Sequence, residues 1–274
     1  MGTSYLTVIT RGLRLTGKLI HGLILVGIVF PRIRPALRAA VIGQWCREVL
    51  EILAIRLTMH GDIPPSTVRS VLFVANQVSW LDFLAVNACR PVRFVVKAEV
   101  RRWPVIGWLA AKIGTLFLRR TTSRETGRLA ARMRSMLLRG RCLTVFPDGT
   151  TTTGVSVASF HNDLFESAIA AGSPVWPVAI QYRNTDGTPA RSVAFVGEQS
   201  WFGSILTVLK QPATEACLGF AQPIESTGQD RRTLAARCRA AIERQLADQG
   251  TTRPRPEPVL LPATQPWAPP LSAA

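Results

Sequence analysis

The chain has 274 residues, enough to bury a full hydrophobic core in one domain or two. Hydrophobic residues make up 47% and charged residues 18%, which excludes a disordered chain. The 33 Lys and Arg residues against 17 Asp and Glu give a net charge of +16, which favours anionic partners. Because the basic residues are mixed with apolar runs and no nucleic-acid-binding motif is present, we expect an anionic membrane surface and no nucleic acid.

The five cysteines are scattered, odd in number and without a Cys-x-x-Cys pair. This pattern argues against a disulfide framework or a zinc site and favours a reducing compartment. With only three histidines in the chain, a His-rich metal cluster is excluded and we expect no metal. We also expect no cofactor.

Residues 19–31 form an uncharged, mostly apolar run of 13 residues near the N-terminus. A helix of that length spans about 20 Å, which is short of the roughly 30 Å of a bilayer core. Basic residues flank the run on both sides: Arg11, Arg14, Lys18, Arg32, Arg34 and Arg38. This pattern favours a segment in one leaflet or along the interface over a spanning helix, a secretory signal or a buried soluble helix. We expect attachment at the cytoplasmic face of the inner (plasma) membrane.

The remaining chain predicts an α/β fold, a single domain with a mixed sheet flanked by helices and preceded by an N-terminal membrane-associated helical hairpin. Residues 36–57 are the expected second helix of the hairpin, and 60–65 the expected turn after it. The predicted strands are 71–75, 92–96, 115–118, 142–146 and 175–180. The predicted helices are 103–112, 124–139, 163–171 and 231–247. We divide the chain into residues 1–58, a catalytic-type domain over 59–249, and a proline-rich disordered tail over 250–274.

The central stretch is residues 71–82, Val-Leu-Phe-Val-Ala-Asn-Gln-Val-Ser-Trp-Leu-Asp. A buried strand is followed by polar residues, and Ser79 has the position and chemistry of a helix cap. Asn76, Gln77 and Asp82 therefore fall where open α/β sheets place their ligands. An isolated segment of this kind is more often a polar turn without chemistry.

Residues 76–82 nevertheless resemble the first motif of the membrane glycerolipid acyltransferases, the lysophosphatidate acyltransferase family. The family pattern is Asn-His-x-Ser-x-x-Asp, in which His is the general base and Asp orients it. The resemblance therefore implies catalytic positions at 77 and 82, and Gln77 stands where the family has His.

Residues 114–120 resemble the family's second motif, Gly-x-x-Phe-x-x-Arg, through Gly114, Phe117 and Arg120. The resemblance implies that Arg120 binds the phosphate of the acceptor. The planar fork of an arginine suits this role because it makes two charge-assisted bonds to phosphate oxygens.

Residues 146–150 resemble the third motif, Phe-Pro-Glu-Gly-Thr, with Asp148 in place of Glu. Gly149 permits a close approach, and the backbone N–H groups with the hydroxyls of Thr150 and Thr151 can cradle an anion. An ordinary Pro-Asp-Gly turn would have the same sequence.

Two further segments match less closely. Residues 175–179 resemble the fourth motif and are expected to pack in the core or to line an acyl pocket. His161 is the one histidine near a motif, and we interpret it as a surface or helix-start residue rather than a replacement base.

What the four motifs imply is acyl transfer from a thioester, acyl-ACP or acyl-CoA, to a lysophospholipid hydroxyl. Lysophosphatidate is the default acceptor and a lyso-ornithine lipid the alternative. Because the amide of Gln77 cannot accept a proton near pH 7, the chain is inactive or slow, uses another base, or carries an altered form of a once-active site. A pseudoenzyme that binds lipid or protein, and a basic nucleic-acid-binding protein, are the competing hypotheses.

Overall fold

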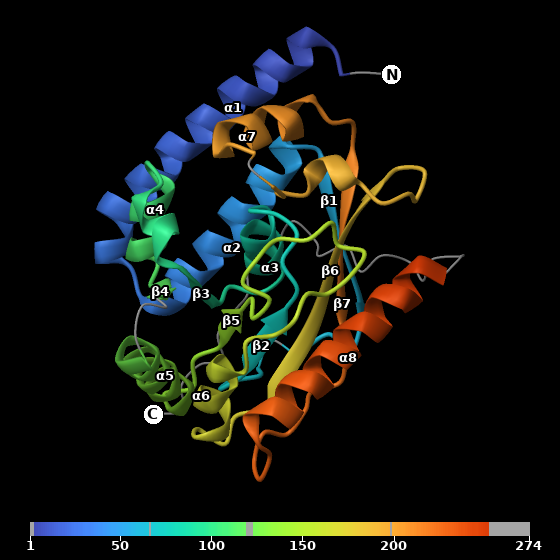
Figure 1. Ribbon diagram of the computed structural model, residues 1–274. Coiled ribbons are helices and arrows are strands. Elements are labelled where there is room, and N and C mark those ends of the chain that lie inside the picture. The colour runs from blue at the N-terminus through green and yellow to red at the C-terminus, as the bar shows by residue number, and fades with distance from the viewer. Residues whose placement is uncertain (1–2, 66, 119–122, 198, 252–274) are drawn as a thin grey trace.

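The centre of the fold is a seven-stranded sheet, shown in the computed structural model of Figure 1, which describes residues 3–65, 67–118, 123–197 and 199–251. The strand order is β1-β7-β6-β2-β5-β3-β4. The strands are β1 Ile55–Gly61, β2 Leu72–Ala75, β3 Arg93–Lys97, β4 Leu116–Leu118, β5 Leu143–Val145, β6 Val175–Asn184 and β7 Thr214–Phe220. Neighbouring strands are parallel except β6 and β7, which are antiparallel. The predicted α/β fold with a mixed sheet is confirmed.

Helices cover both faces of the sheet (Figure 1). The α-helices are α1 Tyr5–Ile24, α2 Pro35–Ile52, α3 Asp82–Cys89, α4 Ile106–Lys112, α5 Ser123–Leu138, α6 Glu166–Ile169, α7 Trp201–Lys210 and α8 Arg231–Thr251. One core cluster joins α1, α2, α3 and α7 to one face, and a second joins α5, α6 and α8 to the other. The helices therefore bury the sheet between two layers.

Strand β2 lies at the centre of this arrangement because its side chains alternate between the two cores. Phe73 and Ala75 belong to the cluster with α1 to α3, whereas Leu72 and Val74 belong to the cluster with α5 and α8. This alternation follows from the two-residue period of a strand. A strand buried on both faces reads as a continuous apolar run, which is why the sequence identified it.

All five predicted strands are present, with shifted ends, but the sequence missed β1, β7 and α7. The prediction of a helix over 36–57 is wrong beyond Ile52, where α2 ends. Ala54 has a φ of 55°, which interrupts the helical backbone, and β1 begins at the next residue. The predicted turn over 60–65 is wrong at His60 and Gly61, which are the last residues of β1.

The N-terminal segment is one continuous helix over Tyr5–Arg32, in which α1 is followed by a π-helical turn, Leu25–Val29, and a 3-10 turn, Phe30–Arg32. Its 28 residues are long and apolar enough to cross a membrane by length and composition. The estimate based on 13 uncharged residues was therefore too short, because the helix includes the basic residues before that run.

Helices α1 and α2 form the predicted hairpin. The indole Nε1 of Trp45 donates to the carbonyl of Lys18 at 3.1 Å, and Lys18 forms an ion pair with Glu48. Gly22 lies directly against the Trp45 ring, since a Cβ there would be 3.1 Å from the indole. Both helices join the hairpin to the domain, because Leu15 of α1 and the buried residues of α2 enter the main core.

Candidate active site

The turn after β2 starts with Asn76, which ties that strand to β6. Its Nδ2 donates to the carbonyl of Ile180 at 2.9 Å, and its Oδ1 accepts from the backbone N–H of Ile180 at 2.8 Å. The side chain is fully buried. Asn76 therefore replaces backbone pairing at the end of the strand and fixes where the following residues emerge.

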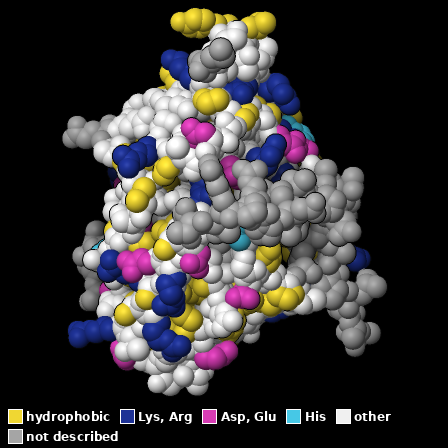
Figure 2. All heavy atoms as spheres, turned by 90° about the vertical axis from the view of Figure 1, so that its right-hand side faces the viewer, with side chains coloured by type: hydrophobic (Ala, Val, Ile, Leu, Met, Phe, Trp, Pro, Cys, Tyr) yellow, Lys and Arg dark blue, Asp and Glu magenta, His cyan; other side chains and the backbone are white. Residues whose placement is uncertain are grey.

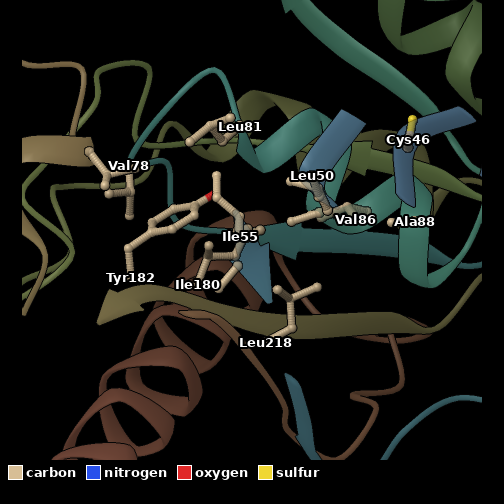
Figure 3. Close-up of a cluster of buried hydrophobic side chains, with 14 of the residues drawn as sticks. Cys46, Leu50, Ile55, Val78, Leu81, Val86, Ala88, Ile180, Tyr182 and Leu218 are labelled. Atoms are coloured by element: carbon tan, nitrogen blue, oxygen red, sulfur yellow. The ribbon is translucent and has the colours of Figure 1, made fainter. Parts of the chain in front are cut away.

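The carboxyl of Asp82 closes the same turn. Its Oδ2 accepts from the backbone N–H groups of Val78 and Ser79, at 2.7 and 2.9 Å, and its Oδ1 accepts from the hydroxyl of Tyr182 at 2.8 Å. Figure 3 shows Tyr182 in an apolar cluster with Val78, its hydroxyl directed toward the turn that carries Leu81. Burial raises the pKa of the Asp82 carboxyl to about 7, although all three hydrogen bonds oppose that shift.

The expectation that Ser79 caps the helix is wrong. Helix α3 begins at Asp82, its N-cap is Leu81, and no side chain caps it by a hydrogen bond. The buried hydroxyl of Ser79 has no hydrogen-bond partner. Asp82 takes the role predicted for Ser79 in a different way, because its carboxylate accepts from the N–H groups that precede the helix.

Gln77 is held through its backbone by the turn that follows β5. Its N–H donates to Asp148 Oδ2 at 2.8 Å, and its carbonyl accepts from the N–H of Thr152 at 2.9 Å. Among the described residues its half-buried side-chain amide has no hydrogen-bond partner. Position 77 is therefore fixed in place while its side chain stays available.

Asp148 is the second buried carboxyl of the site. Within the described part of the chain its Oδ1 has no hydrogen-bond partner, although only 5% of the residue is exposed. Burial raises the pKa of this carboxyl to about 7 against the backbone hydrogen bonds and the charge of Lys97. The negative charge of Asp148 adds to the rise in the pKa of Asp82, so the two acids lie close enough to interact. Neighbouring strands β2, β5 and β3 thus bring positions 77, 148 and 97 together at their carboxyl ends.

The other predicted anion-binding residues divide into two kinds. Gly149 has a φ of 62°, which explains the glycine, and Thr150 is exposed. The hydroxyl of Thr151, in contrast, donates to the carbonyl of Phe195 and so fastens the turn. Arg120 lies outside the described residues, and its role stays a prediction.

The structure gives His161 and the fourth motif roles that differ from those of the two carboxyls. His161 is exposed, and its backbone N–H donates to the carbonyl of Pro147. Trp176 of the fourth motif is buried in the core and stacks on Phe73 with ring centroids 6.2 Å apart. The fourth motif therefore supports the sheet, which is the packing role expected for it.

An apolar chamber adjoins the turn after β2. The sequence placed the wall of an acyl pocket at residues 175–179, but none of these residues lines this chamber. Its volume is about 180 Å³. Its lining comes mainly from α1, α2, α3, α4 and α7 and includes Trp80 of the first motif and Phe83 and Leu84 of α3. Voids of about 150 Å³ with such a lining stay dry and bind hydrocarbon. Local sequence patterns do not show this chamber, since the residues that face one another across it come from distant segments.

The chain resembles known proteins in both sequence and fold. The sequence model described as Acyltransferase matches residues 56–181. The lyso-ornithine lipid O-acyltransferase of Pseudomonas aeruginosa is 37% identical over 91% of this chain and 96% of its own length. The 1-acyl-sn-glycerol-3-phosphate acyltransferase of Neisseria meningitidis is 32% identical over 78% of this chain and 84% of its own.

A solved structure shows the same fold. The 1-acyl-sn-glycerophosphate acyltransferase of Thermotoga maritima superposes with a TM-score of 0.65, at 20% identity, over 90% of this chain and all of that one. The chain belongs to the acyltransferase family, among the lysophospholipid acyltransferases.

Proposed function

We propose that this protein transfers a fatty acyl group from a thioester to the hydroxyl of a lysolipid at the cytoplasmic face of the inner membrane. The observation that carries this proposal is the apolar chamber, whose wall continues from the turn that holds Gln77 and Asp82. A chain of methylene groups lying there would be removed from water, which stabilises it by about 0.8 kcal/mol for each group.

In the proposed reaction the acceptor hydroxyl attacks the thioester carbonyl. A C–O bond forms, the C–S bond breaks, and the hydroxyl proton passes by way of a base to the departing thiolate. The donor is an acyl-ACP or acyl-CoA. Gln77 can orient the hydroxyl by a hydrogen bond but cannot take its proton.

The acceptor we place first is a lyso-ornithine lipid. The sequence motifs alone ranked lysophosphatidate first. The relative named as a lyso-ornithine lipid acyltransferase has the higher sequence identity, however, and the match covers almost the whole length of both chains. Lysophosphatidate is the second candidate, because a relative of that name is 32% identical.

The test is to supply the full-length protein with radiolabelled acyl-ACP and with each acceptor in parallel. Faster transfer to the lyso-ornithine lipid supports our order, and faster transfer to lysophosphatidate reverses it. Binding of both acceptors without transfer would show a lipid-binding pseudoenzyme.

A chamber variant tests the position of the acyl chain. Ala110 lines the chamber, so Ala110→Phe should shift the preference toward shorter donors. Ala131→Phe is the matched control, because Ala131 is exposed on α5. Unchanged chain-length preference in Ala110→Phe would place the acyl chain elsewhere.

We propose attachment along the membrane surface rather than across it. One side of the N-terminal helix contacts the domain: Arg11 donates to the carbonyls of Leu209 and Gln211, and Leu15 of α1 and Phe30 of the following 3-10 turn are buried. If this helix spanned the membrane, the part of the domain packed against it would have to lie inside the bilayer. The opposite side is an exposed apolar stripe of Leu6, Ile9, Leu13, Ile20, Ile24 and Ile28.

Figure 2 shows the end of the molecule where α1 begins, with hydrophobic side chains at its tip. The net charge of +16 and the five free cysteines support an anionic, cytoplasmic surface. Leu13→Asp with Ile24→Asp should release the protein from membranes after a high-salt wash. These exposed positions are preferable to deletion of residues 1–40, because α1 also lines the chamber. Retention of the double variant would place the anchor elsewhere.

A further inference from the structure

A basic cleft lies at the end of the sheet opposite the proposed acyl-transfer site. It has a volume of about 820 Å³, and eight of its 19 lining residues are Lys or Arg while none is Asp or Glu. Arg93 opens β3 and Arg141 shortly precedes β5. The cleft is therefore at the amino ends of these strands, whereas Gln77 and Asp148 follow the carboxyl ends of β2 and β5.

Two arginines meet in this cleft without a counterion. The guanidinium of Arg93 is half-buried, and its pKa is lowered by burial and by the nearby charge of Arg141. Among the described residues, neither side chain has a carboxylate or hydrogen-bond partner. Two like charges held together in a partly buried place are stabilised by an anion between them, and the guanidinium fork matches a phosphate.

Gly114 helps to build this pair. A Cβ on Gly114 would lie 3.2 Å from Arg93 Nε, and the residue has a φ of 91°. A side chain there would be strained and would crowd the guanidinium. The glycine of the second motif thus has a structural role at the cleft.

The cleft adjoins both the apolar chamber and the exposed apolar surface. Phe30, Ile42 and Ile113 line the cleft and the chamber together. Arg34, the N-cap of α2, and Arg38, in the first turns of that helix, line the cleft. Figure 1 shows this end of α2 beside β3 and β4. Exposed apolar side chains lie close by in sequence: Ile28, Leu37 and Trp108.

We propose that this cleft binds the phosphate of an anionic phospholipid in the membrane on which α1 lies, with the headgroup between Arg93 and Arg141. The proposal rests on the proposed membrane attachment but concerns a site separate from acyl transfer. A concave cationic site beside apolar surface suits a lipid. A protein partner would require a contact of about 800 Å² on each side.

Vesicle binding by the full-length protein tests this. Vesicles of phosphatidylcholine alone are compared with vesicles of about three parts phosphatidylcholine to one part phosphatidylglycerol, whose surface charge attracts basic residues. Arg93→Gln with Arg141→Gln should reduce the preference for the anionic vesicles roughly 30-fold, since each basic residue at such a surface contributes about fivefold.

The matched control removes the same charge elsewhere. Arg237 and Arg244 are exposed on α8, which covers the other side of the sheet, so Arg237→Gln with Arg244→Gln should change the preference little. An equal loss in the two double variants would show general attraction and overturn the site. If Arg93→Gln with Arg141→Gln lowers the melting temperature, the exposed pair Arg34→Gln with Arg139→Gln replaces it.

Two soluble ligands test binding at this cleft independently of membrane attachment. A short-chain phosphatidylglycerol below its micelle concentration should bind wild type and not the Arg93–Arg141 variant, even if the chain binds no vesicles. Inorganic phosphate binding as tightly would indicate a free-phosphate site and overturn the lipid assignment. Loss of binding to an acidic acyl carrier protein, with lipid binding unchanged, would overturn it in favour of a protein partner.

Discussion

The turn after β2 and the turn after β5 each bury one carboxyl, and burial raises the pKa of both to about 7. They differ in their hydrogen bonds. Asp82 accepts three, with both oxygens engaged, whereas Asp148 leaves Oδ1 without a partner. The first turn is closed on itself and against β6, while the second is joined to the first through Gln77.

This difference separates two roles. A buried polar atom left without a partner costs about 1 to 3 kcal/mol, so the fold gains nothing by keeping Asp148 half-bonded. We infer that Asp82 is a positioning residue, whereas Asp148, although buried, keeps one oxygen able to accept a further hydrogen bond or a proton. Substitutions at Gln77 and at the two carboxyls test this assignment, and a substitution at Arg120 tests the separate phosphate role; they are given in order of expected effect.

Gln77→His should raise acyl transfer by about two orders of magnitude, the usual worth of a positioned general base. The backbone of residue 77 is already fixed by Asp148 and Thr152, so the new imidazole would start from the correct place. Its activity should fall on the acidic side of about pH 6 to 7, where imidazole titrates. Initial rates across pH with the preferred acceptor measure both effects.

The control for this gain is the double variant Gln77→His with Asp82→Ala, which should lose much of it because the imidazole loses its orienting carboxylate. If wild type turns over rapidly and Gln77→His changes neither rate nor pH profile, the base lies elsewhere. Asp148→Asn is then the first substitution to examine and His161→Ala the second. Asp148 comes first because it contacts residue 77 directly.

Arg120→Ala should weaken the binding of lysophosphatidate about ten- to a hundredfold, the worth of a lost charge-assisted bond. Binding of a neutral lysolipid should change much less. Titration of both ligands into wild type and variant gives the comparison, and Arg124→Ala, exposed on α5, is the control. Equal losses for the two ligands would remove the phosphate role from Arg120 and leave anion recognition to the turn after β5.

The sequence predicted the parts of this site but not how they meet. Val71 to Ala75 stood out because an apolar run ended at polar motif residues, and the run proved to be the central strand. Strand β1 was missed because Arg56, Thr58 and His60 interrupt its apolar residues and α2 ends only shortly before it. The sequence-based prediction therefore extended the helix of residues 36–57 into the first residues of β1.

The contacts that define the two turns come from strand order, which no local pattern contains. Asp148 meets Gln77 because β2 and β5 are neighbours, although 71 residues separate the two positions. Tyr182 reaches Asp82 from β6 across 100 residues. The motifs supplied the residue types, and only the folded sheet shows which oxygen of each carboxyl is engaged.

The two carboxyls should also affect stability differently, and this is the smallest expected effect. A carboxyl whose pKa rises on folding, here from 3.8 to about 7, favours the folded state most below pH 4. That contribution is lost as the pH rises through about 7, because the folded state must then hold a buried charge. The free energy of unfolding of wild type should therefore decline between about pH 4 and pH 7 from these two groups.

Asp148→Asn should remove its share of that decline and raise the free energy of unfolding at pH 8 by about 1 to 2 kcal/mol relative to pH 5. The amide oxygen can still accept from the N–H of Gln77, and the amide N–H₂ takes the place of an oxygen that had no partner. Asp82→Asn should gain less, because its amide N–H₂ would face either the two backbone N–H groups or the Tyr182 hydroxyl. Urea unfolding of wild type and both variants at the two pH values measures this. Equal changes for the two variants would mean that both carboxyls are engaged to the same degree, and the distinction between a closed turn and an open one would fail.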